Sequence, residues 1–380
     1  MKRLLIFLLL PLMLLFSTPA LALEPMQDND IPIAAPSAIL IEKTTGTILY
    51  EKNAYEHLAP ASVTQVMTML LVLEAVENGS LSMDTPVTAS ARAASMGGSQ
   101  IWLEEGEQMT VSEMLKCIAV VSANDCCVAL AEHISGSEEA FVARMNRRAA
   151  ELGLSNTNFT SCSGLCDSDA HYTCAYDLAV ISRELLSHDQ IKEYSTIWID
   201  SIRNGEFGLS NTNKLIYHYP GATGLKTGFT SKAMYCLSAS AERDGVEFIA
   251  VVLHAASSAE RFDSARTLLN HAFANYTLAS PEGVGTLSPV PVTLGTAPTV
   301  QPALPEGPCV LLEKNSAAKL SYELSLPESI PAPVTAGDEI GSLSMYADGE
   351  LLQTIPLLAE SSVPRLTLFQ RFSLLLSHLV

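Results

Sequence analysis

Three short segments of the sequence carry the hydroxyl, amide and ammonium groups that serine-based catalysis uses. They are Ser62-Val63-Thr64-Gln65, Ser122-Ala123-Asn124 and Lys226-Thr227-Gly228. Each has an ordinary structural explanation by itself, because serine and asparagine are common helix caps and a lysine on an edge strand is unremarkable. The three together, each in a distinctive structural context, indicate a catalytic site.

The first two segments are expected at helix boundaries. A helix predicted over 62–77 begins at the first segment and is apolar on almost every side, so it should be buried at the centre of its domain. The second segment interrupts two helices. One of them begins at a capping box of Thr110 and Glu113 and runs to about 121, and the other ends near 135.

The third segment lies in a region with strand character. Strands are predicted at 38–41, 48–50, 223–230, 235–241 and 247–254, with the turn Glu242-Arg243-Asp244-Gly245 between the last two. Further helices are predicted at 137–153, 173–187 and 258–276. Strands therefore open and close the domain while helices fill its middle. We expect one antiparallel sheet flanked by helices, with the buried helix packed against it, an α/β (α+β) fold.

The composition changes after this domain. Residues 278–363 are rich in Pro, Val, Leu and Gly and contain short alternating runs around an Asp348-Gly349 turn, which predicts a small all-β domain. Residues 364–380 are predicted to form an amphipathic helix with Arg365 and Arg371. This helix is too short to span a bilayer, so we expect it to lie in the membrane interface. An ordinary helix packed on the β-domain is the alternative.

Export is expected from the N-terminus. Met1-Lys2-Arg3, an apolar run and Ala20-Leu21-Ala22 have the pattern of a signal peptide over 1–22, which leaves the first domain at 23–277. A retained N-terminal anchor is the alternative. The protein should therefore work at the outer face of the cytoplasmic membrane. The formal net charge of −19 argues against a nucleic-acid partner.

Eight cysteines leave the disulfide pattern open. Four fall in predicted helices, where small buried thiols are common, namely Cys117, Cys126, Cys127 and Cys174. Cys162 and Cys166 lie in a predicted loop and are able to pair. No Cys/His cluster has the spacing of a zinc site, so we expect neither a metal nor a cofactor.

The chain resembles the serine D-alanyl-D-alanine carboxypeptidases, the low-molecular-mass penicillin-binding proteins of the β-lactamase-like superfamily, which carry S-x-x-K, S-x-N and K-T-G. The segments "PASVTQVMT", "VSANDCCVALAE" and "GATGLKTGFTSKAMYCLSASAERDG" are similar to those of the family, as is "AGDEIGSL" in the second domain. The resemblance covers about residue 30 to the C-terminus. It implies a transpeptidase-like fold, binding of the D-Ala-D-Ala end of peptidoglycan stem peptides, and reaction with β-lactams.

The resemblance also implies roles for individual residues. Ser62 would be the nucleophile, and the backbone N–H groups of Ser62 and Phe229 would form the oxyanion hole. Lys226 and Thr227 would hold the terminal carboxylate of the substrate. Gly228 would allow the substrate to approach the backbone closely.

The second segment has implied roles as well. Ser122 would relay a proton toward the leaving amine. Asn124 would bind the amide side of the substrate and fix the catalytic residues.

Gln65 departs from the family pattern, because it occupies the position of the lysine that deprotonates the serine. A neutral amide has no basic nitrogen, so it cannot accept that proton. A second departure is Met234, where a small residue is expected after the K-T-G strand and where a larger side chain would narrow the site.

Three hypotheses follow for the function. The chain is a working carboxypeptidase that trims pentapeptide stems, or a catalytically impaired relative that binds stem peptides or wall partners, or a structural wall protein. Ser62, Ser122, Asn124 and Lys226 favour a retained substrate site over the third hypothesis. Gln65 discriminates between the first two.

Overall fold

The computed structural model describes residues 25–26, 30–280, 287–304, 308–314, 316 and 319–371. Within the chain, two compact units are distinguished. The larger unit comprises Leu23–Ala279 together with Leu311–Ser316, and the smaller comprises Ser280–Val310 and Ala317–Val380. The predicted signal peptide over 1–22 lies outside the described residues.

The larger unit is built on a five-stranded sheet in the order β2-β1-β9-β8-β7. Its strands are β1 (Ser37–Glu42), β2 (Ile48–Lys52), β7 (Ala222–Thr230), β8 (Met234–Arg243) and β9 (Val246–Ala255). All four pairings are antiparallel. Strands from the two ends of the domain therefore meet in one sheet, as predicted.

The β8–β9 connection explains how the last two strands pair. Asp244 and Gly245 have φ of 52° and 77°, the left-handed conformations that a two-residue type I′ hairpin requires. Asp-Gly is a favoured sequence for this turn, which keeps the right-handed twist of the two strands.

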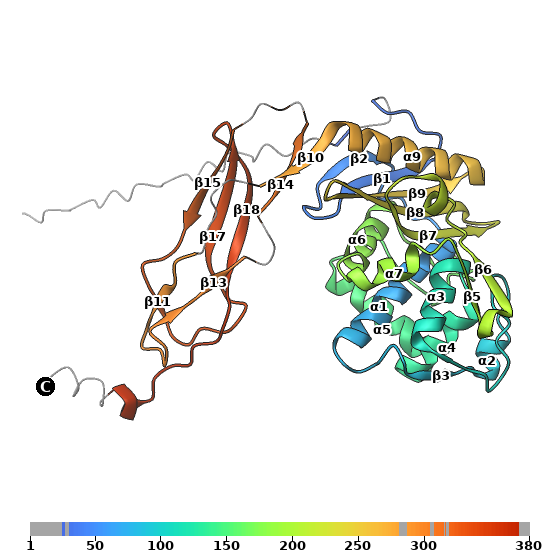
Figure 1. Cartoon of the computed structure of the whole chain (residues 1–380), viewed down its shortest axis with the longest axis horizontal. Helices are drawn as coiled ribbons and strands as arrows, with labels where there is room; N and C mark the ends of the chain where they lie inside the picture. Colours follow the sequence, from blue (N-terminus) through green and yellow to red (C-terminus); the bar gives the residue numbers. More distant parts are fainter. Residues whose placement is uncertain are drawn as a thin grey trace, which may run out of the picture. The chain divides into compact units, whose positions relative to one another are not determined.

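Helices cover both faces of the sheet (Figure 1). Helix α9 (Ser258–Asn275) packs on the outer face, where it shares a hydrophobic core with Leu40, Phe248 and Ala250. The inner face contributes Ile39, Ile249 and Val251 to a second, larger core that contains the remaining long helices. Alternate residues of one strand thus serve two cores, as the period of a strand dictates.

The inner helices occupy the places that the sequence indicates. They are α1 (Gln65–Glu77), α3 (Val111–Val121), α4 (Asn124–Ser135), α5 (Glu138–Glu151) and α6 (Ala175–Leu185). Ten of the thirteen residues of α1 are buried, which confirms the prediction of a central helix. Helix α6 contacts both α1 and the strands β1 and β9, so α1 reaches much of the sheet through α6 rather than directly.

Shorter elements complete the larger unit. They are η1 (Ala61–Thr64), β3 (Pro86–Thr88), α2 (Ala91–Ala94), β4 (Gln108–Thr110), η2 (Asp189–Ile191), α7 (Lys192–Ser195), β5 (Ile199–Ile202), η3 (Arg203–Gly205), β6 (Phe207–Ser210), α8 (Leu215–His218) and β10 (Tyr276–Ala279). Strands β5 and β6 form an antiparallel hairpin of their own. The predicted capping box is present, because Thr110 and Glu113 exchange side-chain to backbone hydrogen bonds at the start of α3.

The smaller unit is all-β, as predicted. Its strands are β11 (Val290–Thr293), β12 (Thr299–Val300), β13 (Pro302–Ala303), β15 (Leu320–Ser325), β16 (Ile330–Pro331), β17 (Glu339–Ala347) and β18 (Glu350–Ala359). Strand β14 (Val310–Glu313), which belongs to the larger unit from Leu311 on, pairs with β10 of that same unit. Asp348 and Gly349 join β17 to β18 with φ of 50° and 86°, a second type I′ turn.

The expected C-terminal helix is only partly within the described residues. Residues 364–366 still belong to the β-domain, since Pro364 O accepts from Thr296 N and Leu366 N donates to Leu294 O, each at 2.8 Å. A helical turn begins at Leu368, and 372–380 lie outside the described residues. No helix in the described part of the chain is long and apolar enough to cross a membrane.

Candidate active site

Ser62 lies in a tight turn that leads into the central helix. The turn is the 3-10 helix η1, which continues without a break into α1, so the first turn of the predicted helix is 3-10 rather than α. Ala61 precedes Ser62 with a φ of 49°, a left-handed conformation that is uncommon for a residue with a side chain. Ser62 is half-buried while its neighbours Ala61 and Val63 are buried. The fold therefore presents this one hydroxyl at the start of a buried helix.

The strand that carries the third segment lies directly against this turn. A Cβ added to Gly228 would stand 2.7 Å from Pro60 O and 3.1 Å from Ser62 N. Any larger residue would push β7 away from η1. Gly228 is therefore a glycine because two backbones meet there, and this contact brings the third segment to the first.

Gln65 joins the first segment to the second. Its side chain is fully buried, and Nε2 donates to Asn124 Oδ1 at 3.0 Å and to Ser163 O at 3.2 Å. The carbonyl oxygen of Ser122 is 3.4 Å from the same nitrogen. In the other direction, Ser122 Oγ donates to Gln65 Oε1 at 3.3 Å. The predicted proximity of these residues is thus present in the structure.

The surroundings of Gln65 Nε2 are better matched to an ammonium than to an amide. Three oxygen acceptors lie within 3.4 Å of this nitrogen. An amide NH₂ has two hydrogens, whereas a lysine ammonium has three donors and a positive charge. The number of acceptors around this nitrogen therefore also fits the ammonium of a lysine at position 65.

Ser122 and Asn124 are held by the break between α3 and α4. Ser122 adopts the left-handed conformation with φ 66° and ψ 37°, which ends α3 and turns the chain. Asn124 opens α4, and its Nδ2 donates to Gly97 O at 2.9 Å while its N–H donates to Ser99 O at 2.8 Å. Both ends of the Asn124 amide are engaged within the protein, so one amide hydrogen is left to meet a ligand.

Lys226 is buried on β7 without a carboxylate partner among the contacts of the described residues. Its Nζ donates to Thr227 O at 3.0 Å. Burial lowers the pKa of the Lys226 ammonium to about 7, and the nearby Arg261 charge acts in the same direction. A substantial fraction of this amine is therefore neutral at neutral pH. Thr227 Oγ1 donates to Thr212 Oγ1 at 2.8 Å, and the Phe229 ring packs on Tyr235.

Arg261 is a residue of this region that the sequence did not reveal. It extends from α9 to the strands β7 and β8, where Nη1 donates to Gly228 O at 3.0 Å and to Cys236 O at 3.2 Å. Its buried Nε has no hydrogen-bond partner among the described residues. A cation buried with an unused donor next to the K-T-G strand is suited to an anion. Arg261 belongs to no short catalytic motif of the sequence, because it lies within α9, a helix that otherwise packs on the sheet.

The loop over 160–171 packs on the turn that carries Ser62. Thr160 N donates to His171 Nδ1 at 2.9 Å, so the hydrogen of the neutral ring is on Nε2, which donates to Thr64 Oγ1 at 2.8 Å. Thr64 Oγ1 in turn donates to Ala61 O at 2.8 Å. Gly164 sits so close that an added Cβ would stand 1.9 Å from Ala61 O. This loop therefore fixes both flanks of Ser62.

The structure answers one question that the sequence left open and gives a reason for a second expectation. Cys162 and Cys166 are not paired, because Cys162 is turned into the core with Sγ 3.5 Å from Glu138 Oε1, while Cys166 is half-buried near Thr160. Met234 has a φ of 55°, so the preference for a small residue at this position has a backbone cause at the start of β8. The four thiols predicted in helices are confirmed as buried, although Cys174 caps α6 rather than lying inside it.

Two protein-family profiles match the chain. Residues 24–257 match D-alanyl-D-alanine carboxypeptidase, and residues 284–365 match the C-terminal domain of penicillin-binding protein 5. The D-alanyl-D-alanine carboxypeptidase DacF of Bacillus subtilis is 43% identical over 372 residues, which cover 96% of this chain and 95% of that protein.

Solved structures give the same result. Penicillin-binding protein 5 of Haemophilus influenzae superposes with a TM-score of 0.73 at 28% identity, covering 88% of this chain and 98% of that one. Penicillin-binding protein D2 of Listeria monocytogenes, solved in its ampicillin-bound form, gives a TM-score of 0.59 at 32% identity, over 64% of this chain and 99% of that one. The expected transpeptidase-like sheet and the C-terminal β-domain are confirmed.

The buried histidine predicts a pH-dependent stability. Burial, aided by the Lys232 charge, lowers the pKa of His171 to about 4. An unfolded chain takes up this proton near pH 6.5, so between these values the unfolded state binds more protons. We expect the free energy of unfolding to fall by about 3 kcal/mol as the pH decreases from 6.5 to 4.

The variant His171→Gln tests this expectation, because glutamine keeps one donor and one acceptor but does not titrate. Urea-induced unfolding measured at several pH values should show a clearly flatter profile for His171→Gln. The exposed His133→Gln variant serves as the control and should retain the slope. An unchanged slope in His171→Gln would assign the acid sensitivity to other groups.

Proposed function

Because the chain belongs to the D-alanyl-D-alanine carboxypeptidase family, we propose that the site around Ser62 binds the D-Ala-D-Ala end of peptidoglycan stem peptides and reacts with β-lactams. Ser62 Oγ bonds to the carbonyl carbon of the penultimate D-alanine, the terminal D-alanine leaves as the amine, and water releases the acyl group. The observation that carries this proposal is the close approach of β7 at Gly228 to the turn of Ser62, which brings a nucleophile and a lysine-bearing strand together.

The substrate carboxylate has candidate partners on β7 and α9. Lys226 and the Thr227 hydroxyl lie on the strand beside Ser62, and Arg261 contributes a buried cation with an unused Nε donor. A carboxylate that enters this site raises the pKa of Lys226 again and favours its ammonium form. Binding of the anion and protonation of Lys226 are therefore coupled. The backbone N–H groups of Ser62 and Phe229 are the proposed oxyanion hole.

Acylation in this chain needs a proton acceptor other than residue 65. Gln65 cannot take the proton of Ser62, and its Oε1 already accepts from Ser122 Oγ. Lys226 is the amine on which the proton can end, by way of the Ser122 hydroxyl, and its pKa of about 7 suits a base at neutral pH. The same amine is needed to bind the carboxylate. Acylation of Ser62 is therefore slow.

A binding protein without useful turnover is the second candidate. It is favoured by Gln65, whose hydrogen bonds keep the site assembled while the base is missing. In this case the chain holds stem peptides or wall partners and releases no D-alanine. The two candidates differ only in the rate of acylation.

The proposed location is outside the cytoplasmic membrane. The N-terminal pattern over 1–22 supports export, and the tail beyond Leu366 supports attachment to the membrane surface. Leu368 and Phe369 at the start of this tail are 83% and 81% exposed, so the first turn offers an apolar surface to lipid.

Restoring the lysine should restore fast acylation. Loss of a general base commonly costs 10²- to 10⁴-fold, so we expect Gln65→Lys to label with a fluorescent penicillin roughly 100-fold faster or more. The same variant should release more D-alanine from a diacetyl-Lys-D-Ala-D-Ala substrate. Labelling is followed on gels over time.

Two controls accompany this experiment. Ser62→Ala should not label, and Gln108→Lys, which adds a lysine at an exposed site on β4, should label as slowly as the unaltered chain. Rapid stoichiometric labelling of the unaltered chain at Ser62 would refute the assignment of slow acylation. If Gln65→Lys labels no faster than the unaltered chain, another departure from the family, such as Met234, limits acylation.

Removal of the tail should release the protein from membranes. We expect a chain that ends at Leu366, which keeps the contacts of residues 364–366, to stop sedimenting with anionic vesicles. The double variant Leu368→Glu/Phe369→Glu should bind them more weakly. Continued sedimentation of the shortened chain, after cleavage of its signal peptide, would contradict the proposed anchor.

A further inference from the structure

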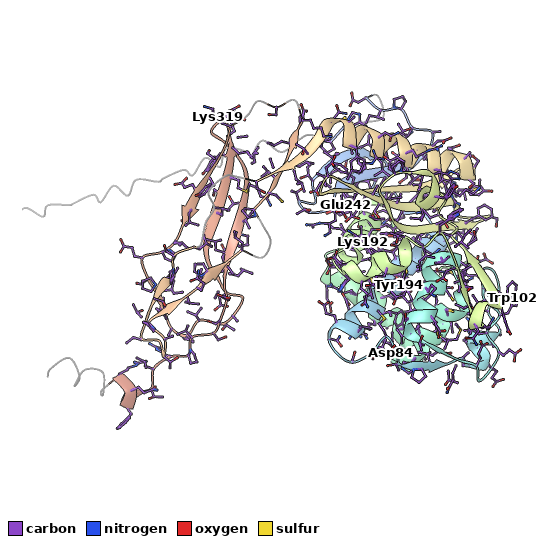
Figure 2. All side chains as sticks on the ribbon, in the orientation of Figure 1. Asp84, Trp102, Lys192, Tyr194, Glu242 and Lys319 are labelled. Carbon is purple, nitrogen blue, oxygen red and sulfur yellow. The ribbon has the colours of Figure 1, made fainter. Side chains whose placement is uncertain are left out.

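Trp102 is held in an exposed position by a strained backbone. Its side chain is 64% exposed, and Figure 2 shows it at the outer edge of the larger unit. Its φ of 54° lies in the left-handed region, which is a genuine outlier for a bulky aromatic residue. Such strain persists only where the surroundings enforce it, and it is concentrated at functional sites.

The surroundings of Trp102 do enforce this conformation. The N–H groups on either side, those of Ile101 and Leu103, both donate to the buried Asp125 Oδ2, at 3.0 and 3.1 Å. Arg203 Nη2 donates to Trp102 O at 3.3 Å, and the indole meets the edge of Phe207 with 5.9 Å between ring centroids. The ring is thus fixed in place with much of its surface open to solvent.

The same framework connects Trp102 to the active site. Asp125 is the residue after Asn124, and Asn124 bonds to the loop that carries Trp102 through Gly97 O and Ser99 O. A second connection runs through the β5–β6 hairpin, whose second strand begins at Phe207. The chain continues from this strand to Thr212, whose hydroxyl accepts a hydrogen bond from Thr227 of the K-T-G strand.

The length of this hairpin places Trp102 relative to the substrate. Thr212 and Phe207 are five residues apart, which corresponds to roughly 15–17 Å in an extended chain. A pentapeptide stem spans at most about 17 Å. A stem whose D-Ala-D-Ala end lies at Thr227 and that extends along this hairpin therefore reaches Trp102 where the peptide joins the glycan.

The charge around Trp102 favours a sugar over a peptide. Glu104 and Glu105 follow it and are exposed, on a chain with a formal net charge of −19. These carboxylates disfavour the anionic side chains of a stem peptide, whereas they accept hydrogen bonds from hydroxyl and acetamido groups. The flat C–H face of a pyranose ring matches an exposed indole. An aromatic surface with a few polar groups is a common form of ligand site.

We propose that Trp102, on the edge of Phe207 and beside Glu104 and Glu105, is a subsite for an N-acetylated sugar of the glycan strand. The subsite binds the sugar to which the stem peptide is attached, so it rests on the proposed function at Ser62. It gives this chain a preference for stems that are still attached to glycan.

The first test uses a sugar without any peptide. The chain has two tryptophans, so in the Trp198→Phe protein Trp102 is the only one left. Titration with the β-1,4 tetramer of N-acetylglucosamine should then give a saturable change in tryptophan emission. Emission that does not change up to the solubility limit of the sugar would overturn the proposal.

The second test compares a disaccharide-pentapeptide with the same pentapeptide without sugar, by calorimetry on Ser62→Ala protein, which does not turn over. Trp102→Ala should weaken binding of the sugar-bearing ligand roughly five- to tenfold and leave the sugar-free ligand unchanged. The matched control is Tyr55→Ala. Tyr55 is 49% exposed and packs on Tyr176 of α6, and its replacement should alter neither ligand.

The outcomes separate this proposal from the function assigned to Ser62. Equal weakening of both ligands by Trp102→Ala would make the indole a peptide contact and overturn the sugar assignment. If neither peptide binds the Ser62→Ala protein, the assigned stem-peptide function fails, and the tetramer titration alone then decides whether Trp102 binds sugar.

Discussion

The buried amide of Gln65 is the interaction on which the active site depends. Its side chain hydrogen-bonds to the α3–α4 break at Ser122 and Asn124 and also to the loop at Ser163. Because it is wholly buried, its donors and acceptor must be satisfied within the protein, which fixes the α3–α4 break and the loop relative to α1. An amide performs this structural task nearly as well as an ammonium. It does not perform the chemical task of accepting a proton.

The rest of the site is held by contacts that do not involve residue 65. Gly228 brings β7 against the turn of Ser62, Gly164 brings the loop against the same turn, and His171 fixes Thr64. In the proposed function, these contacts keep the substrate site assembled without a lysine at position 65, so binding and acylation would depend on different residues. The proposed sugar subsite at Trp102 likewise does not depend on residue 65, because the backbone around Trp102 is held by Asp125 and not by Gln65.

Much of the fold and the core of the site could be predicted from the sequence. The reason is that the successful predictions rest on local signals, namely hydrophobic periodicity, the Thr110–Glu113 capping box and the two Asp-Gly turns. The structure contains the elements that these signals predict. The contacts of Arg261 and the burial of Cys162 as a free thiol could not be predicted, since each depends on residues distant in sequence. The position of Trp102 is similar, because its exposure follows from contacts with Asp125 and Arg203. The substitution at Gln65 can be read from the sequence, whereas the three acceptors around its side-chain nitrogen can be identified only in the structure.

The pre-steady-state rate of Ser62 acylation by a penicillin, measured across pH, tests the central claim most directly. With Gln65 in place, the second-order rate constant at penicillin concentrations well below saturation, which reports the protein before the carboxylate binds, should be small and should rise as the pH passes about 7, where the buried Lys226 loses its proton. A fast rate that is equal to that of Gln65→Lys and independent of pH in this range would contradict the account. Residue 65 would then not limit the chemistry.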